Sequence, residues 1–390
     1  MPNERQLKIA YLCETSPLVT WAHSGGNTRI YNTLKQHAGD VTIIDSGWGG
    51  LDFLRKAVEC LPLSIKMRLR FRLHLFLSRF ISRHVSKQLK KEKYDVLFCS
   101  YSFFCLANLK LPYPLLTVFT SDATYTAYKN SKVGQAFGSY FSLSRLLDPI
   151  ILKAEKKVYG ATDLMLWPSK WIKDSADKLY SLNDEQSRLV HWGANINPPK
   201  PEELMLDNPI GDEVRLLLVG RDWFPKGGPV VYEVLKELIK RGVNAHLTVV
   251  GCVPPDFHTH EKMTIHPQLD KNDPEQYKTF TSLYKTSHFF VMPSYEAYGF
   301  AFCEAGAYGL PALCLQVGGV PVTDGVNGHA LADGAQPSDF VEKIMDYMDS
   351  ADKYKNLRTS TRRYYEEHLH WDAWGQKATE LITSKLVTAS

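Results

Sequence analysis

Short apolar runs rich in β-branched and aromatic residues alternate along the chain with longer segments in which apolar residues recur every three or four positions. The short runs have the length of β-strands and the longer segments have the period of amphipathic helices, so the pattern predicts parallel βαβ units. A first series of strands is expected at 7–12, 41–45, 95–99, 115–119 and 163–167. A second series is expected at 214–219, 246–250, 288–292 and 312–315.

Three prolines with flanking charges lie between the two series, at 197–204, and are typical of a linker. A chain of 390 residues also favours two cores over one. We therefore predict an α/β protein with two doubly wound, Rossmann-like domains, at 1–200 and 201–365, and a helix at 366–390 that returns to the first domain. Ligands of such sheets bind beyond the carboxyl ends of the strands, so we expect the site in a cleft between the domains.

One segment, 66–93, carries ten lysines and arginines and a single acid, Glu92. Its cations recur at helical spacing beside a stripe of apolar residues, which predicts a basic amphipathic helix, although strict alternation over 66–77 also fits a strand. The cations are Arg68, Arg72, Arg79, Arg83 and Lys90, and the apolar stripe is Leu69, Leu73, Phe76 and Phe80. Such an element suits an anionic membrane surface, and an ordinary solvated helix is the alternative. No nucleic-acid-binding motif accompanies the charges, so nucleic acid is not an expected partner.

Composition narrows the class of protein further. Hydrophobic residues make up 44% and charged residues 23%, which excludes disordered, collagen-like and disulfide-scaffold proteins. The seven cysteines form no CxxC pair, so we expect free thiols and no metal site. The apolar runs are too short to span a membrane and charges occupy the position of a signal-peptide core, so the expected location is the cytoplasm, with the inner membrane face as a peripheral site.

The stretch 287–321 is predicted to form a strand, a loop, a helix and a strand. The helix should begin near Gly299 and end at Gly309, because Pro311 prevents its continuation. A helix start offers unpaired N–H groups and a partial positive charge, which together suit a diphosphate. These groups would belong to Tyr298, Gly299, Phe300 and Ala301.

Two glutamates flank that helix start, Glu296 in the loop and Glu304 one to two turns into the helix. Both carboxylates could accept hydrogen bonds from the hydroxyl groups of a ligand held there, such as the ribose and the sugar of a nucleotide sugar. The alternative is purely structural, with one acid on the surface and the other in a salt bridge.

Cations follow the first strand of the second series, where Arg221 and Lys226 lie in a turn before a helix that should start near Pro229. At the carboxyl end of a strand they could neutralise a leaving diphosphate, and without ligand contacts they would be cations of a surface turn. No Asp-x-Asp sequence occurs, so we expect no divalent metal. Gly25 and Gly26, before another predicted helix, would let the backbone approach a phosphate or a sugar.

Taken together, these motifs resemble glycosyltransferase family 4, and the most specific match is PSYEAYGFAFCEAGAYGLP at 293–311. The resemblance implies the two-domain GT-B fold and retaining transfer from a UDP- or GDP-sugar to a glycan, lipid-linked or small-molecule acceptor. It also implies that Glu304 holds the ribose and Glu296 the donor sugar. Arg221 and Lys226 would then hold the diphosphate, and Gly25 and Gly26 would line the donor.

Two positions depart from the family pattern. Asp122 is present where the family often has a His-Asp pair, but Ser121 replaces the histidine, so the polar helper is either of these two residues. The loop VGGVPVTDGVNG lacks the acid that usually follows its glycine pair. Aromatic residues that could stack on an acceptor sugar, or simply pack in a core, are Trp21, His23, Tyr101, Phe103, Phe104 and Tyr125.

A retaining glycosidase needs two carboxyl groups that flank the bond about 5 Å apart. Glu296 and Glu304 would lie on one side of the donor, so we interpret them as binding groups in a front-face reaction without a covalent intermediate. A non-catalytic binding or chaperone subunit of the same fold, or a sugar-nucleotide epimerase, remains an alternative.

Overall fold

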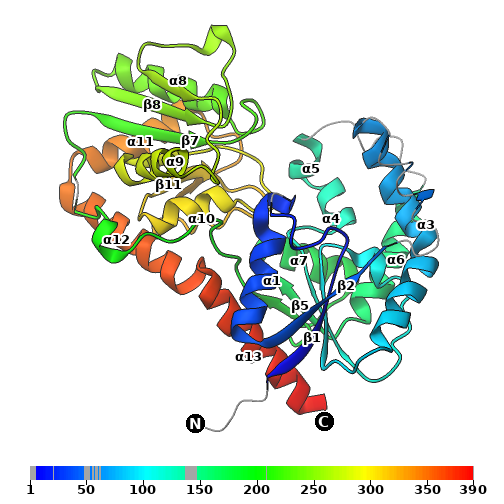
Figure 1. Cartoon of the computed structure of the whole chain (residues 1–390). Helices are drawn as coiled ribbons and strands as arrows, with labels where there is room; N and C mark the ends of the chain where they lie inside the picture. Colours follow the sequence, from blue (N-terminus) through cyan, green and yellow to red (C-terminus); the bar gives the residue numbers. More distant parts are fainter. Residues whose placement is uncertain are drawn as a thin grey trace. The chain divides into compact units, whose positions relative to one another are not determined.

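The computed structural model describes residues 6–20, 22–47, 53–54, 57, 60, 63–136, 147–207 and 209–389. The chain forms two compact units, shown in Figure 1. Unit 1 consists of residues 1–192 and 374–390, and unit 2 consists of residues 193–373. Each unit contains one six-stranded parallel sheet, as the α/β pattern predicts.

Unit 1 has the strand order β2-β1-β3-β4-β5-β6. Its strands are β1 (Leu7–Cys13), β2 (Gly39–Asp45), β3 (Val96–Ser100), β4 (Leu116–Thr120), β5 (Leu164–Trp167) and β6 (Ser187–Leu189). Its helices are α1 (Gly26–His37), α3 (Leu63–Leu89), α4 (Tyr125–Asn130), α5 (Lys132–Ala136), α6 (Asp148–Gly160) and α7 (Lys170–Tyr180), with short 3₁₀ turns η1 (Ala22–Gly25) and η3 (Phe103–Cys105). All five strands expected from the sequence form.

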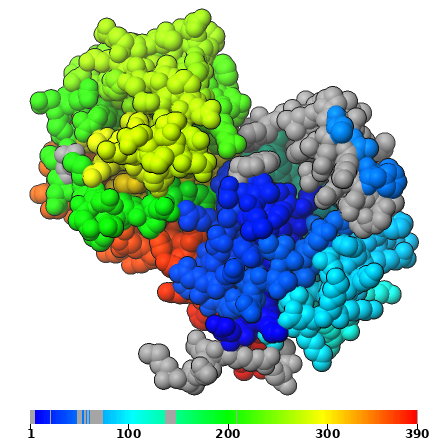
Figure 2. All heavy atoms as spheres, viewed as in Figure 1, coloured from blue at the N-terminus to red at the C-terminus, as the bar shows by residue number. Residues whose placement is uncertain are grey.

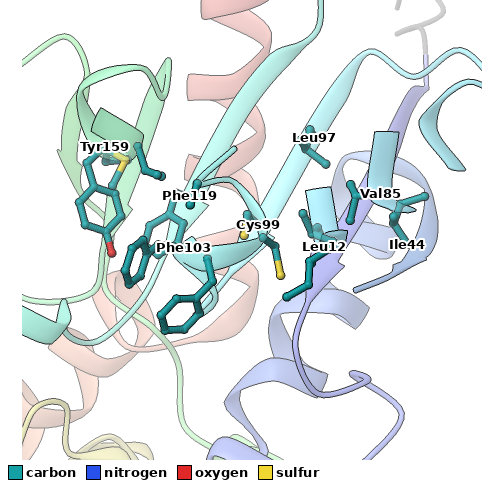
Figure 3. Close-up of a cluster of buried hydrophobic side chains, with 14 of the residues drawn as sticks. Leu12, Ile44, Val85, Leu97, Cys99, Phe103, Phe119 and Tyr159 are labelled. Carbon is teal, nitrogen blue, oxygen red and sulfur yellow. The ribbon is translucent and has the colours of Figure 1, made fainter. Parts of the chain in front are cut away.

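Helices cover both faces of this sheet (Figure 1). Side chains of α3, α6 and α7 pack with the strands in one buried cluster, in which Val85 lies beside Ile44 and Tyr159 beside Phe119 (Figure 3). On the other face Phe98 of β3 contacts Trp374, with ring centroids 6.3 Å apart. Trp374 belongs to α13 (Trp371–Ala389), so the end of the chain completes the second face of unit 1.

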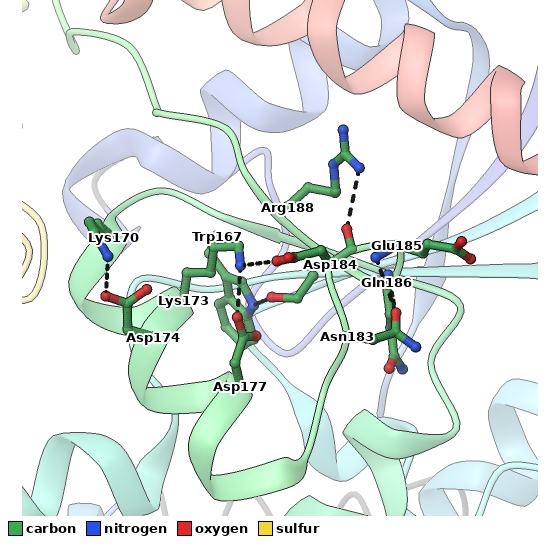
Figure 4. A network of polar contacts seen from close by, with 11 residues as sticks. Trp167, Lys170, Lys173, Asp174, Asp177, Asn183, Asp184, Glu185, Gln186 and Arg188 are labelled. Carbon is green, nitrogen blue, oxygen red and sulfur yellow. Dashed lines mark hydrogen bonds and ion pairs between the residues drawn. The ribbon is translucent and has the colours of Figure 1, made fainter.

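A polar network surrounds β6, a strand that the sequence did not predict (Figure 4). Trp167 of β5 donates from its indole Nε1 to Ser187 Oγ, 3.0 Å away. Next to this pair, Lys173 of α7 forms ion pairs with Asp177 (2.7 Å) and Asp184 (3.0 Å). With three residues and few apolar side chains, β6 is set by these tertiary contacts and carries too little hydrophobic pattern to be recognised.

Unit 2 has the strand order β12-β11-β10-β7-β8-β9. Its strands are β7 (Val214–Val219), β8 (Ala245–Val250), β9 (Met263–His266), β10 (Phe289–Val291), β11 (Ala312–Leu315) and β12 (Gly328–Leu331). Its helices are α8 (Gly228–Lys240), α9 (Pro274–Thr286), α10 (Phe300–Ala307), α11 (Pro337–Met348) and α12 (Ala351–His368), with 3₁₀ turns η5 (Pro201–Glu203) and η6 (Asp256–His258). The four predicted strands form, whereas β9 and β12 were not predicted.

Two layers of helices enclose this second sheet. Residues of α8, α11 and α12 form one buried cluster with the strands. On the other face, the ring of Phe290 in β10 contacts Tyr284 of α9 and Phe302 of α10, with centroids 6.1 and 5.2 Å apart. Because β7 and β10 pair in parallel, the loops that follow them lie at the same edge of the sheet, where the strands end.

The basic segment forms a helix, α3, so the strand alternative for 66–77 is wrong. The predicted apolar stripe does not form its buried face, since Phe76 is 64% and Phe80 48% exposed. The buried face carries His74, Ser78, Ile81, Ser82, Val85 and Leu89. Its serines donate to carbonyls one turn back, which lets these polar residues lie inside.

The side chains of Arg68, Leu69, Arg72 and Leu73 lie outside the described residues. None of the helices in the described part of the chain combines the length and the hydropathy that crossing a bilayer requires.

Candidate functional site

The loop between β7 and α8 carries Lys226 and is held against the β10–α10 loop by close backbone packing. Gly227 adopts a left-handed conformation, φ 76°, and a Cβ atom there would overlap the carbonyl of Pro293. Trp223 is buried in the same loop and donates from Nε1 to Nδ1 of His258, 3.0 Å away. The fold of the loop therefore positions Lys226 next to residue 293 and its neighbours.

Lys226 Nζ forms an ion pair with Glu296 Oε1, on an oxygen that also accepts from Ser294 Oγ at 2.9 Å. Glu296 is only 9% exposed, and its backbone pairs with the strand-like stretch at Gly318 and Gly319. A carboxylate buried to this degree is stable when a cation and a hydroxyl compensate its charge. The carboxylate and the ammonium thus present opposite charges at the carboxyl edge of the sheet.

The helix α10 starts directly after this pair, with Gly299 as N-cap and, among the described side chains, none that caps it. The first turn of α10 contains Phe300 and Ala301, two of the residues expected at the helix start, and Tyr298 is buried beside them. Two arginines of α12, Arg358 and Arg362, donate to carbonyls at the other end of the helix. A positive N-terminus with cations at the C-terminus agrees with the helix dipole.

Glu304 lies inside α10 with 3% of its surface exposed. Its Oε1 forms an ion pair with Lys271 Nζ at 2.7 Å, and its Oε2 accepts from Tyr284 Oη at 3.0 Å. Burial, and secondly the charge of Glu304, raise the pKa of Tyr284 well above its usual value, so this phenol remains a hydrogen-bond donor. The salt bridge that was the structural alternative for Glu304 is thus formed, with Lys271 as its partner.

Arg221 is exposed in the same loop as Lys226 and takes no part in the ion pair between Lys226 and Glu296. The structure thus brings together Lys226, Glu296 and the start of α10, with Glu304 further along the helix. Ser294, Lys271 and Tyr284 were not predicted as members of this site. The Pro-Ser that precedes the motif was the signal that could have indicated Ser294. No local pattern could have indicated Lys271, because it lies 33 residues from Glu304 in the sequence.

The other predicted residues belong to unit 1. His23, Ser24 and Gly25 all adopt left-handed conformations before α1, and Tyr101 does so after β3. His23 stacks on Tyr101, with ring centroids 4.0 Å apart and planes at 13°. Non-glycine residues rarely adopt such angles outside sites that need them, so the cluster supports a role for this loop.

Asp122 lies near the same tyrosine. Burial, and secondly the charge of Asp122, raise the pKa of Tyr101 well above its usual value. Ser121, in the position of the family's histidine, is buried and donates from Oγ to the carbonyl of Ala123 at 2.7 Å. Its hydroxyl is thus engaged in the local turn.

Glu155, which the sequence analysis missed, supports this loop. It is fully buried on α6, and its carboxylate accepts from both the backbone N–H and the hydroxyl of Thr126. Burial raises the pKa of Glu155 above its usual value. An acid within the apolar face of a helical segment was the signal in the sequence that could have revealed it.

The aromatic candidates for an acceptor surface divide into two groups. Phe103 and Phe104 are buried in the core of unit 1, so packing explains them. His23 is exposed and Tyr125 is partly buried, while Trp21 lies outside the described residues.

Two family models match the chain. The model described as Glycosyltransferase Family 4 matches residues 24–197, and the model described as Glycosyl transferases group 1 matches residues 213–350. The two matches do not overlap, and between them they include every residue predicted to bind the donor or to act as the polar helper.

Curated proteins with similar sequences include D-inositol 3-phosphate glycosyltransferases. The one from Mycolicibacterium smegmatis is 30% identical over 218 residues, which cover 54% of this chain and 43% of that protein. The one from Corynebacterium efficiens is 28% identical over 185 residues, which cover 44% and 42%. Spore coat protein SA of Bacillus subtilis is 23% identical over 257 residues, which cover 61% and 59%. The chain thus spans about half the length of the curated relatives it matches.

Solved structures with a similar fold cover nearly the whole chain. Sucrose-phosphate synthase from Thermosynechococcus elongatus has a TM-score of 0.67 at 16% identity and covers 98% of this chain and 100% of its own. WaaG, a glycosyltransferase involved in lipopolysaccharide biosynthesis, has a TM-score of 0.60 at 15% identity and covers 96% and 99%. HepE from Anabaena, solved with UDP and glucose, has a TM-score of 0.58 at 12% identity and covers 97% and 100%. At these identities the likeness establishes the fold.

Proposed function

Because this chain belongs to the group 1 glycosyltransferases of family 4 and has their GT-B fold, we propose that it transfers a sugar from a nucleotide sugar. The donor is a UDP- or GDP-sugar, and the acceptor is a glycan, a lipid-linked sugar or a small molecule. The observation that carries the proposal is the Lys226–Glu296 ion pair next to the N-terminus of α10.

In this proposal the diphosphate binds to Lys226, Arg221 and the first N–H groups of α10. Negative charge develops on the phosphate oxygen as its bond to the sugar breaks, and a fixed cation stabilises that charge in a poorly solvated site. Glu296 accepts hydrogen bonds from hydroxyls of the donor sugar, and Glu304 accepts from the ribose. These cations supply the charge that a metal supplies in other transferases, so the reaction is proposed to be metal-independent.

Retention follows from a front-face reaction. The acceptor oxygen bonds to the anomeric carbon on the side from which the diphosphate leaves, and its proton passes to the departing phosphate oxygen. On unit 1 we assign Gly25 and Gly26 to backbone contacts with phosphate or sugar, and Asp122 to the polar helper near the acceptor. The proposed reaction requires no covalent intermediate between the sugar and a side chain.

The test is a panel of UDP-, GDP- and ADP-sugars assayed for protection against thermal unfolding, then for transfer to supplied acceptors, with and without EDTA. UDP-glucose comes first, since HepE was solved with UDP and glucose. Protection by one nucleotide class, transfer that survives EDTA and an unchanged anomeric configuration in the NMR spectrum of the product support the proposal. Inversion, or loss of transfer with EDTA, contradicts it.

The same panel separates the two alternatives. A binding or chaperone subunit would be protected by a nucleotide and transfer no sugar, while an epimerase would convert the donor without any acceptor. The retained Lys226 and Glu296 favour the transferase, because binding alone does not require a cation at the leaving group.

A second proposal concerns α3, which we assign to docking on an anionic membrane surface at the cytoplasmic face. Phe76 and Phe80 are exposed, and the guanidinium of Arg83 lies 5.8 Å from the ring centroid of Phe80. Exposed aromatic rings beside cations suit the headgroup region of a bilayer.

Replacing Arg79 and Arg83 by glutamine should weaken sedimentation with vesicles that contain phosphatidylglycerol by about 2 kcal/mol, or roughly thirtyfold. A matched control removes the same charge from α8 by Lys236→Gln and Lys240→Gln, and should sediment like the wild type. Equal sedimentation of the two double variants would exclude α3 as the docking surface.

A further inference from the structure

Glu304 is held by two groups that come from α9 and the segment before it, Lys271 on Oε1 and Tyr284 on Oε2. Each carboxylate oxygen can accept two hydrogen bonds, so one acceptor position remains on each oxygen. The two groups differ in access, because Tyr284 is fully buried whereas the Lys271 side chain is 40% exposed. A ligand that reaches Glu304 therefore also meets Lys271.

Lys271 has a defined position in spite of its exposure. Its ammonium lies 4.5 Å from the ring centroid of Phe280, in addition to its 2.7 Å contact with Glu304. Phe280 is itself 3% exposed, so the ring is a fixed platform. The yellow atoms of α9 and the segment before it form part of the surface of unit 2 in Figure 2.

Glu304 and Lys271 together offer a hydrogen-bond acceptor and a hydrogen-bond donor at one place. An ammonium has three N–H groups, one of which is used by Glu304, and a sugar hydroxyl can donate one hydrogen bond while it accepts others. A hydroxyl placed at this pair would donate to the carboxylate and accept from the ammonium, so both bonds would be charge-assisted. A hydrogen atom in place of that hydroxyl would leave both charged groups without this partner.

We propose that Lys271 is a nucleotide-binding residue that, together with Glu304, recognises a ribose hydroxyl and makes the site select ribonucleotides over deoxyribonucleotides. This inference rests on the proposed function, which assigns the ribose to Glu304. It adds a cation that no local sequence pattern indicates, and it gives that cation a role in binding, separate from the role of Lys226 at the leaving diphosphate.

The test measures dissociation constants by calorimetry for UDP and GDP and for their 2′-deoxy and 3′-deoxy forms. The wild type should prefer the ribonucleotide over at least one deoxy form by about tenfold, the size of a hydrogen bond to a charged group. Lys271→Met removes the charge but keeps most of the length of the side chain, and should reduce that preference to about threefold or less. The control Lys278→Met, at an exposed lysine of α9, should keep the wild-type preference.

The preference is a ratio, so a general loss of affinity from disturbed structure does not change it. If Lys271→Met does not fold, Lys271→Gln replaces it in the same comparison. An unchanged preference in the folded variant overturns the inference, and so does a wild type that binds ribonucleotides and deoxyribonucleotides equally. A wild type that binds no nucleoside diphosphate overturns the proposed function as well, so the two failures can be told apart.

Discussion

At the scale of single residues, three buried charged groups of unit 2 have polar or charged partners. Glu296 and Glu304 each contact a lysine, and Arg358, which is fully buried, donates to the carbonyls of Tyr308 and Gly309. Uncompensated charges in such places would cost several kcal/mol. The charges of the candidate site therefore serve stability in the free protein and remain available to a ligand that offers hydroxyls or phosphates.

His288 provides a test at the same scale, because it is buried in its neutral form. Its Nδ1 accepts from the backbone N–H of Arg215 at 3.0 Å. Burial, and secondly the charges of Arg215 and Arg358, lower its pKa from 6.5 to about 3. The unfolded chain thus takes up a proton as the pH falls below 6.5 while the folded chain does not, so stability present above pH 6.5 is lost on the way to pH 3.

Between pH 7 and pH 5 this effect should cost the wild type about 2 kcal/mol of unfolding free energy. His288→Asn, which keeps an acceptor without the titration, should lose that much less over the same interval, as measured by urea unfolding. His246→Asn, at a partly exposed histidine, should follow the wild type. Identical pH dependence in the wild type and His288→Asn would show that the buried imidazole does not control acid stability.

The sequence revealed the acids and the cations of the motif but not the pairs they form. Lys226 and Glu296 could be identified because each belongs to a recognisable strand–loop–helix unit. Lys271 could not, because its position depends on how the loop after β9 returns to α9, and β9 itself has only four residues. Residues that act through tertiary contact leave no periodic signal in the chain.

At the scale of elements, the loop of Lys226 depends on a backbone conformation. Gly227→Ala places a methyl group against the carbonyl of Pro293 in addition to straining a positive φ. The loop must then move away from the β10–α10 loop, so we expect at least tenfold weaker binding of nucleoside diphosphate together with a lower unfolding free energy.

Gly242→Ala is the matched control, since Gly242 has φ 84° but open space around its added Cβ. The unfolding free energy of this variant should fall only by the cost of the left-handed conformation, about 1 kcal/mol, and the variant should bind nucleotide normally. Calorimetry and urea unfolding of both variants measure the two effects. Equal binding by the two variants would mean that the position of this loop does not matter for the nucleotide.

Strands that are continuous apolar runs were predictable, even the three-residue β10, whereas short strands with polar residues were not. All nine expected strands form, because each has an apolar run between helical segments. The strands β6, β9 and β12 have three or four residues and were missed. For α3 the helix was predicted but its buried face was not, since hydrogen-bonded serines and a histidine take the place of apolar residues there.

At the scale of the whole molecule, the family likeness extends over both units, with one model matching 24–197 and the other 213–350. The charged residues proposed for the nucleotide belong to unit 2, whereas Gly25, Gly26 and the residues proposed for the acceptor belong to unit 1. The sequence could assign these residues to one unit or the other because each motif is a short local stretch of the chain. Which sugar and which acceptor are used depends on loops that no motif describes.

The most direct measurement of the central claim is the release of nucleoside diphosphate from UDP-, GDP- and ADP-sugars, with and without acceptors. We predict that the wild type releases diphosphate from one class of donor, and that Lys226→Met lowers the maximal rate by about 10²–10³. Lys236→Met, on the exposed side of α8, should behave like the wild type. No release from any donor by the wild type, or full release by Lys226→Met, would contradict the account.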